Sequence, residues 1–172
     1  MKRTTLAVAL LSGFLAATSI VAAAEEFSLQ VPATQRPTTR ELRAEFPWVK
    51  NIERDSSPTN AVTLTLKQVL RSDESYVNGS EYERRIAQES VLGYQQAAWL
   101  TKNQNDPRIE QALSGLRQLQ IDFPGTVAVS WHGTRSIAHL RRCGELWCLS
   151  WTSIVLGFEE VERGRRLAIG GK

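Results

Sequence analysis

The chain has 172 residues, of which 42% are hydrophobic and 23% are charged. These values are typical of one globular domain with its own core, and they exclude a second large domain. The formal net charge of +3 falls to about +1 if Lys2 and Arg3 are removed with a leader, because 19 basic residues then face 18 acidic ones. A charge this small gives no support for a nucleic acid or an anionic membrane as the partner.

The first 24 residues have the pattern of a secretory signal peptide. A cationic start, Met1 to Arg3, precedes the almost wholly apolar stretch from Leu6 to Val21. Three alanines, Ala22 to Ala24, then offer a small-residue cleavage site. The sequence therefore predicts an exported protein, periplasmic or secreted, with no stable membrane span after cleavage. An uncleaved anchor is the alternative, because a spanning helix needs about 20 apolar residues.

The mature chain is predicted to begin with a lead-in and then to form a single α+β domain over residues 38–172. Residues 25–37 contain two prolines and no helical period, which is typical of an extended or disordered segment. Thr38 and Glu41 have the spacing of a capping box, which predicts a short helix. Residues 48–60 are predicted to be a loop. The alternation after residue 61 fits a strand, although the start of a helix fits it equally.

Two longer helices make residues 38–124 the mostly helical half of the prediction. The first spans about 80–103, and Gly93 inside it predicts a kink or a close helix crossing, since glycine costs about 1 kcal/mol relative to alanine in a helix. The second starts at Pro107, with Asp106 as its cap. The apolar stripes of both helices predict that they pack as an antiparallel hairpin.

Residues 125–172 are predicted to form a mixed half with the element order β-α-β-β. A strand ends near Trp131, a helix runs from Thr134 to about Arg142, and the Trp-rich stretch from Leu146 to Leu156 gives one or two strands. A final hairpin is expected over residues 158–169. The fold class is therefore α+β, with an N-terminal helical hairpin packed on a small C-terminal β-α-β-β sheet.

The two cysteines carry the most testable chemistry. In an oxidising compartment Cys143 and Cys148 are expected to form a disulfide, and they are the only possible intramolecular pair. The bridge requires the chain to fold back on itself, because five strand steps span about 16 Å and bridged Cα atoms lie about 4.4–6.8 Å apart. Gly144 supplies the flexible residue, and the bridge joins the end of the predicted helix to the next strand. A redox-active pair is the alternative, but the four intervening residues and the helix end disfavour it.

His132 is the candidate catalytic residue, because it falls at a predicted strand-to-helix turn where a side chain reaches solvent. The alternative is a turn residue that forms local hydrogen bonds. No metal site and no cofactor are predicted. With only two histidines, a metal would need ligands from elsewhere, such as Asp122 or Glu159.

The candidate partner-binding residues are tryptophans and arginines of the C-terminal half. Trp147, Leu149 and Trp151 alternate along a predicted strand and share one face. That face is core if the helical hairpin covers it, and a contact patch if it is open. The full set of candidates is Trp131, Trp147, Trp151, Arg141 and Arg142.

Two functions from different classes are consistent with these features. The first is an exported, non-enzymatic interaction protein, such as an accessory or assembly component of an envelope secretion or transfer complex, with another envelope protein as partner. The β-α-β-β order resembles the small modules that stack in envelope secretion and transport machines, without a shared motif. The second is a small periplasmic hydrolase that uses His132. A concave pocket around His132 would favour the enzyme, and a convex turn the interaction protein.

Overall fold

The computed structural model describes residues 27–71, 73–74, 76–116, 119–154, 158–159 and 165–171. The predicted signal peptide, residues 1–24, lies outside this part of the chain. The described strands are β1 (Ser28–Val31), β2 (Val49–Asp55), β3 (Val62–Gln68), β4 (Tyr76–Val77), β5 (Gln120–Ser130), β6 (Arg135–Cys143), β7 (Leu146–Ser153), β8 (Phe158–Glu159) and β9 (Arg165–Gly171). The described helices are α1 (Thr39–Glu45), α2 (Gly79–Ile86), α3 (Tyr94–Lys102) and α4 (Pro107–Ser114).

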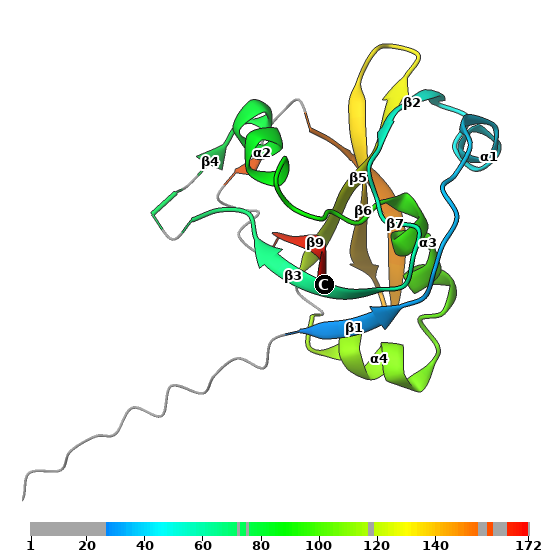
Figure 1. Cartoon of the computed structure of the whole chain (residues 1–172), viewed down its shortest axis with the longest axis vertical. Helices are drawn as coiled ribbons and strands as arrows, with labels where there is room; N and C mark the ends of the chain where they lie inside the picture. Colours follow the sequence, from blue (N-terminus) through cyan, green and yellow to red (C-terminus); the bar gives the residue numbers. More distant parts are fainter. Residues whose placement is uncertain are drawn as a thin grey trace, which may run out of the picture.

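A mixed seven-stranded sheet organises the molecule (Figure 1). Six strands follow the order β1-β3-β9-β5-β6-β7, and β2 pairs with the second half of β5. All of these pairs are antiparallel except β5 with β9. β4 and β8 form a separate two-stranded ribbon. Because β9 lies between β3 and β5, the last described strand is an interior strand of the sheet.

The two faces of the sheet carry separate cores. On one face α3 packs over β5, β6 and β7 and α4 packs against β1, and their shared core includes Leu100, Leu113, Phe123, Leu140 and Trp147. On the other face α2 and the segment before it cover the sheet, and Tyr82 and Ile86 pack against Val127, Ile137 and Leu167. The sheet is therefore buried between two thin helical layers, and several of its strands are apolar on both faces.

β5 changes its neighbour halfway along its length. Its first residues pair with β9, and after a register shift between Phe123 and Val127 its last residues pair with β2. The segment 90–93 passes through the gap, where the Leu92 N–H donates to Ala168 and the Gly125 N–H donates to Leu92. A Cβ atom on Gly125 would lie 2.8 Å from the main chain of Leu92. Glycine is therefore required at this crossing.

The predicted N-terminal helical hairpin is wrong. The expected helix over 80–103 is two short helices separated by residues 87–93, and Val91 there forms a bridge with Ile169 of β9. Gly93 does mark a close approach, because an added Cβ would lie 2.3 Å from the Thr126 hydroxyl, but Gly93 is the N-cap of α3 and not a helix interior residue. Some of the apolar residues that suggested one continuous helical stripe instead lie in residues 90–93, where the chain crosses the sheet in an extended conformation.

The predicted C-terminal β-α-β-β order is also wrong. Residues 135–143 form β6, and Ile137, Ala138 and Leu140 are buried on opposite faces of it. A strand covered on both faces shows no alternation, which is why its sequence pattern was compatible with a helix. Residues 48–60, expected to be a loop, contain β2. The expected hairpin over 158–169 does not form between the described strands, since β8 pairs with β4 and β9 pairs with β3 and β5.

Several local predictions are confirmed. α1 begins with the capping box, in which the Glu41 N–H donates to the Thr38 hydroxyl and the Thr38 N–H donates to the Glu41 carboxylate. α4 begins at Pro107, with the Asp106 carboxylate accepting from the Arg108 N–H. The open choice after residue 61 is settled as strand β3. Among the described residues no helix combines the length and apolarity needed to cross a membrane.

Candidate functional site

The main candidate site is built around Trp151 of β7. Its ring stacks on Tyr94 of α3, with centroids 5.8 Å apart and planes at 14°. Phe46 and Trp48, which follow α1, meet the same ring edge-on at 5.7 and 5.5 Å. These are the favoured geometries for aromatic pairs. The indole N–H of Trp151 is buried and has no acceptor among the described residues, so ring packing holds the cluster.

Tyr94 ties this cluster to α1. Its hydroxyl contacts the Glu45 carboxylate. Burial of the phenol, and then this hydrogen bond, raise the pKa of Tyr94 above its ordinary value. The hydroxyl therefore stays protonated at neutral pH and keeps α1 attached to α3.

Beside the cluster lies a concavity of about 550 Å³, which we call the aromatic groove. Its apolar lining comes from Phe46, Trp48, Leu149 and Trp151, and its polar lining from hydroxyls at 130, 134, 136 and 150. The three aromatic residues are half-buried. Aromatic rings beside a few hydroxyls are typical of sites that bind another molecule, since such rings dominate binding hot spots. None of the lining residues that the structure describes is ionisable.

The hairpin between β5 and β6 places Trp131 and His132 at an exposed tip. Trp131 is 57% exposed, its indole donates to the Pro47 carbonyl, and the Arg43 guanidinium lies 5.2 Å from its ring centroid. His132 is exposed on the same turn, where its N–H donates to the Ser130 hydroxyl. His132 lines neither the aromatic groove nor the basic groove described below. It therefore lies on a convex turn, as a turn residue with a local hydrogen bond.

The other predicted partner-binding residues divide between core and surface. Trp147 is 4% exposed and belongs to the core, so the strand face it shares with Leu149 and Trp151 is largely covered. Arg142 lies over the Trp147 ring and pairs with Glu145. Arg141 is exposed on the opposite face, across from Cys148. The structure brings Trp151 and Trp131 near one groove and leaves Trp147 out of it.

Cys143 and Cys148 are diagonal neighbours on one face of the β6–β7 hairpin, as free thiols, since Cys143 lies across from Leu146 and Cys148 across from Arg141. Gly144, with a φ of 65°, and Glu145 form its two-residue turn, so glycine at the first position is required there. A hydrogen bond between the thiols, together with burial, raises the pKa of Cys148. The prediction placed Cys143 at the end of a helix, and this placement is wrong, because Cys143 is the last residue of strand β6. The disulfide itself stays a prediction.

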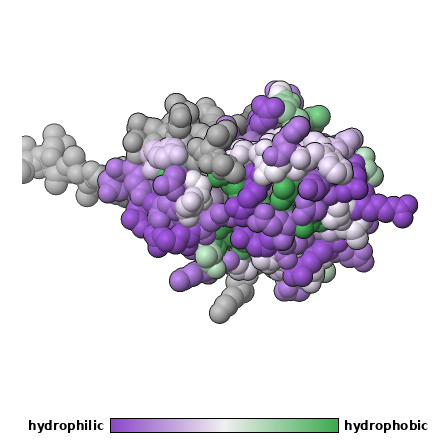
Figure 2. Space-filling model, turned by 90° about the horizontal axis from the view of Figure 1, so that it is seen from above, coloured by the Kyte–Doolittle hydropathy of each residue, from purple (hydrophilic) through white to green (hydrophobic). Residues whose placement is uncertain are grey.

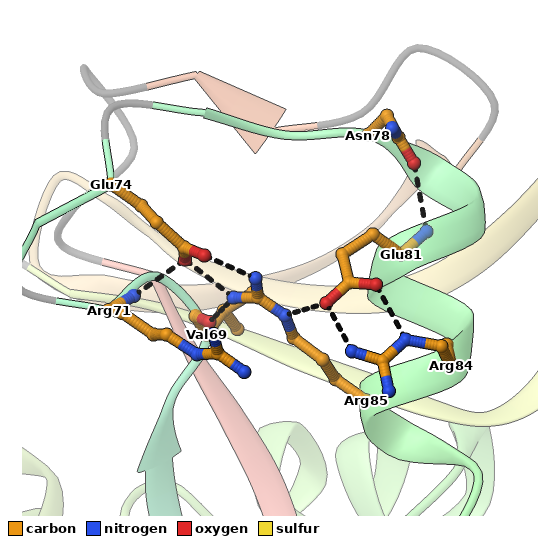
Figure 3. A network of polar contacts seen from close by, with 7 residues as sticks. All are labelled: Val69, Arg71, Glu74, Asn78, Glu81, Arg84 and Arg85. Atoms are coloured by element: carbon orange, nitrogen blue, oxygen red, sulfur yellow. Dashed lines mark hydrogen bonds and ion pairs between the residues drawn. The ribbon is translucent and has the colours of Figure 1, made fainter.

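A second concavity, of about 360 Å³, lies between β3 and α2; we call it the basic groove. Four cations line it, namely Lys67, Arg71, Arg84 and Arg85. Figure 3 shows that the Arg85 guanidinium is held between the Glu74 and Glu81 carboxylates.

The carboxylates around the basic groove occupy most of its cations. Hydrogen bonds from Arg85 lower the pKa of Glu74 to about 2, and those from Arg84 and Arg85 lower the pKa of Glu81 to about 2. Lys67 pairs with Glu89 at the other end. Because the network satisfies itself, it anchors α2 to the segment before it and indicates no ligand.

A buried ionic cluster joins three strands inside the sheet. The Asp122 carboxylate of β5 accepts from the Arg165 guanidinium of β9 at 2.6 and 3.0 Å, and His139 Nδ1 of β6 lies 3.3 Å from it. All three residues are buried. Asp122 therefore contacts the other histidine and an arginine, and not His132. No group of three metal-ligating side chains occurs in the described ranges.

Comparisons with known proteins give no relative: no family model, no curated protein and no solved structure matches the chain.

Sequence reasoning missed most of the aromatic groove. Trp48 lies in the loop predicted over 48–60 and Tyr94 in the helix predicted over 80–103, and neither of them nor Phe46 is predicted as a site residue. The alternation of Trp147, Leu149 and Trp151 placed Trp151 correctly on one strand face. The signal that was available was the high density of aromatic residues at 46–48, 94–99 and 147–151, but only the tertiary fold brings these segments together.

Proposed function

We propose that this protein is an exported, non-enzymatic interaction protein, such as an accessory or assembly component of an envelope complex. Its partner binds in the aromatic groove, and the exposed Trp131 at the hairpin tip extends the contact. The observation that carries the proposal is a concave surface whose apolar lining comes mainly from aromatic rings, with hydroxyls and no ionisable group among its described lining residues.

The energetics of this surface support binding rather than chemistry. Tryptophan and tyrosine are enriched among the residues that dominate interface free energies. In the view of Figure 2 the described surface is mostly hydrophilic, with hydrophobic residues in a few separate patches. A groove of about 550 Å³ has the size of a site for a few side chains.

The hydrolase alternative has weaker support. A general base needs to lie within hydrogen-bond reach of a bound substrate, which requires a cleft around it. His132 lies on an exposed turn, outside both grooves, and its neighbours there are Trp131 and Gly133. The proposal of an envelope location rests on the leader and the cysteines alone, because the β-α-β-β order that resembled secretion modules is not the observed order.

The test is site-specific photo-crosslinking in the source cells. A photoreactive phenylalanine analogue at Trp48 is expected to crosslink one protein, while the same analogue at the exposed Tyr76, far from the groove in the fold, does not. The identified protein is then purified, and its affinity for the wild type is compared with that for Trp48→Ala and the control Tyr76→Ala. Loss of a large interface aromatic predicts a drop of about tenfold or more for Trp48→Ala.

Two results would contradict the proposal. One is a partner that binds Trp48→Ala as tightly as it binds the wild type. The other is a turnover measured on hydrolysable ester or amide substrates that His132→Ala abolishes, which would favour the enzyme.

A further inference from the structure

β7 is an edge strand of the large sheet, and its hydrogen-bonding pattern shows which of its main-chain groups face outward. Cys143 and Leu146 flank a two-residue turn, so they form a hydrogen-bonded pair. In antiparallel strands the pairs then alternate, so the even residues from 146 to 152 bond to β6. The odd residues from 147 to 153 point their N–H and C=O groups away from the sheet.

At Trp147 a side chain takes the place of a neighbouring strand. The Trp147 N–H donates to Oε1 of Gln104 at 2.7 Å, and the Trp147 carbonyl accepts from Nε2 of Gln104 at 3.2 Å. The amide of Gln104 thus reproduces the two bonds of a strand partner. This contact also confirms that the odd residues face outward.

At the next two outward positions the edge is open. The main-chain groups of Leu149 and Trp151 have no outward partner among the residues that the structure describes. Proteins usually block unpaired edges, and here Gln104 blocks only one end. At the opposite edge of the sheet, β1 is a four-residue strand, and so short an edge offers little to pair with.

The open edge borders the aromatic groove. Leu149, Ser150 and Trp151 all line the groove. The groove also extends inward to residues 130, 134 and 136 of the β5–β6 hairpin, so the edge strand at Leu149 and Trp151 forms one of its sides. A strand laid beside β7 would form main-chain bonds to Leu149 and Trp151 and direct every second side chain toward Phe46 and Trp48.

The charge beside this edge is positive. Arg141 lies across from Cys148 on β6, is exposed, and forms no ion pair with a described carboxylate. Its neighbour Arg142 is neutralised by Glu145. An added strand with an acidic residue near Cys148 would complement Arg141.

We propose that the aromatic groove receives an extended peptide segment of the partner, which adds as a strand to β7 at Leu149 and Trp151. The segment carries apolar side chains at alternate positions and an acidic residue at the end near Gln104. Main-chain bonds supply affinity and the groove supplies specificity, as in other cases of strand addition. This inference rests on the proposed function, since it names what the same groove binds.

The experiment uses a phage-displayed library of random peptides of about ten residues, selected on the purified mature protein. An enriched peptide is synthesised with N-methyl groups on its odd residues or on its even residues. Only one of these two forms directs its N–H groups at β7. We expect that one form loses binding by about tenfold or more and that the other binds normally.

Variants of the protein provide the matched comparison. Leu149→Pro removes an outward N–H without removing a bond to β6, whereas Leu149→Val keeps the donor. We expect Leu149→Pro, and not Leu149→Val, to bind about tenfold more weakly. Arg141→Glu is expected to weaken binding severalfold at low salt, and Arg108→Glu, on exposed α4, is not.

The outcomes distinguish strand addition to β7 from the more general proposal that the partner binds in the aromatic groove. If both N-methylated forms bind equally, strand addition is wrong, and this holds even if Leu149→Pro fails to fold. If Trp48→Ala still weakens the peptide in that case, the groove remains the binding site. If sedimentation shows a wild-type dimer that Leu149→Pro converts to a monomer, β7 pairs with a second copy and the peptide proposal is overturned.

Discussion

At the scale of single residues, the sequence signals that proved reliable are those whose cause is local. The capping box of Thr38 and Glu41 and the Asp106–Pro107 start both formed as predicted, because each depends on atoms within one helical turn. His132 was placed correctly in a turn for the same reason. What it contacts, however, depends on the whole fold, so whether His132 opens into a pocket or lies on a convex turn could not be inferred from its neighbours in sequence.

Gly125 shows how a segment distant in sequence can exclude every residue other than glycine at a position. Its Cβ position is occupied by main-chain atoms of Val91 and Leu92 at 2.8 Å, which cannot rotate away as a side chain would. We expect Gly125→Ala to lower the free energy of unfolding by about 1–3 kcal/mol. Chemical denaturation of the purified protein measures this.

Gly115 is the matched control for that substitution. A Cβ there meets nothing within 4 Å, and the backbone φ of −69° suits any residue. Gly115→Ala is expected to be neutral or to stabilise by about 0.4–1 kcal/mol through the unfolded chain. Equal losses for both variants would show that segment 90–93 does not cross β5 as described.

At the scale of elements, burial on both faces decided which predictions failed. β6 and the first half of β5 are buried on both sides, so they lack the period-two alternation that identifies a half-exposed strand. The same composition fits a buried helix, and arginines at its end strengthened that interpretation. β7 was predicted correctly because its two faces differ, with Trp147, Leu149 and Trp151 on one and Cys148, Ser150 and Thr152 on the other.

The β6–β7 hairpin yields the prediction for the cysteines. Cys143 pairs with Leu146 and Cys148 pairs with Arg141, so the two cysteines are diagonal neighbours on one face of the hairpin, where their side chains interact. We expect protein purified from an oxidising compartment to contain a Cys143–Cys148 disulfide, detected as the loss of two hydrogen masses and of reactivity toward thiol reagents. The closed loop is short, so the bridge should stabilise the fold by about 2 kcal/mol.

Cys148→Ser provides the control for the bridge. Under oxidising conditions it should melt at a lower temperature than the wild type, and under reducing conditions the two should melt together. Fully reactive thiols in protein taken from its source compartment would contradict both the disulfide and the predicted export.

At the scale of the whole molecule, the sheet is stabilised by contacts that no local sequence pattern predicts. Asp122, Arg165 and His139 lie on three different strands, and the first two are 43 residues apart in the chain. The sequence offered Asp122 only as a possible metal ligand. Its actual role follows from the parallel pairing of β5 with β9, which brings Asp122 and Leu167 opposite each other.

The buried pair gives the prediction at this scale. Asp122→Ala leaves the Arg165 guanidinium, which is 4% exposed, without its carboxylate. We expect a loss of about 3–5 kcal/mol in the free energy of unfolding, since removing one partner of a buried ion pair is costly. Thermal and urea denaturation should agree on this loss.

The surface pair of Arg108 and Asp106 supplies the comparison. The Arg108 side chain is 89% exposed, and Arg108→Ala should change stability by less than about 1 kcal/mol. If Asp122→Ala costs no more than Arg108→Ala, the ionic cluster does not join the three strands.

The interior position of β9 governs the order in which the molecule can assemble. β3 ends at Gln68, and nearly a hundred residues follow before β9 supplies its neighbour. Until that stretch has left the ribosome, β1 and β3 lack their strand partner, and their contacts with α3 and α4 are what links them to the part of the sheet formed by β2, β5, β6 and β7. Closure of the sheet is therefore a late, long-range event, and a nascent chain cut short before Arg165 lacks the strand that joins the two parts of the sheet.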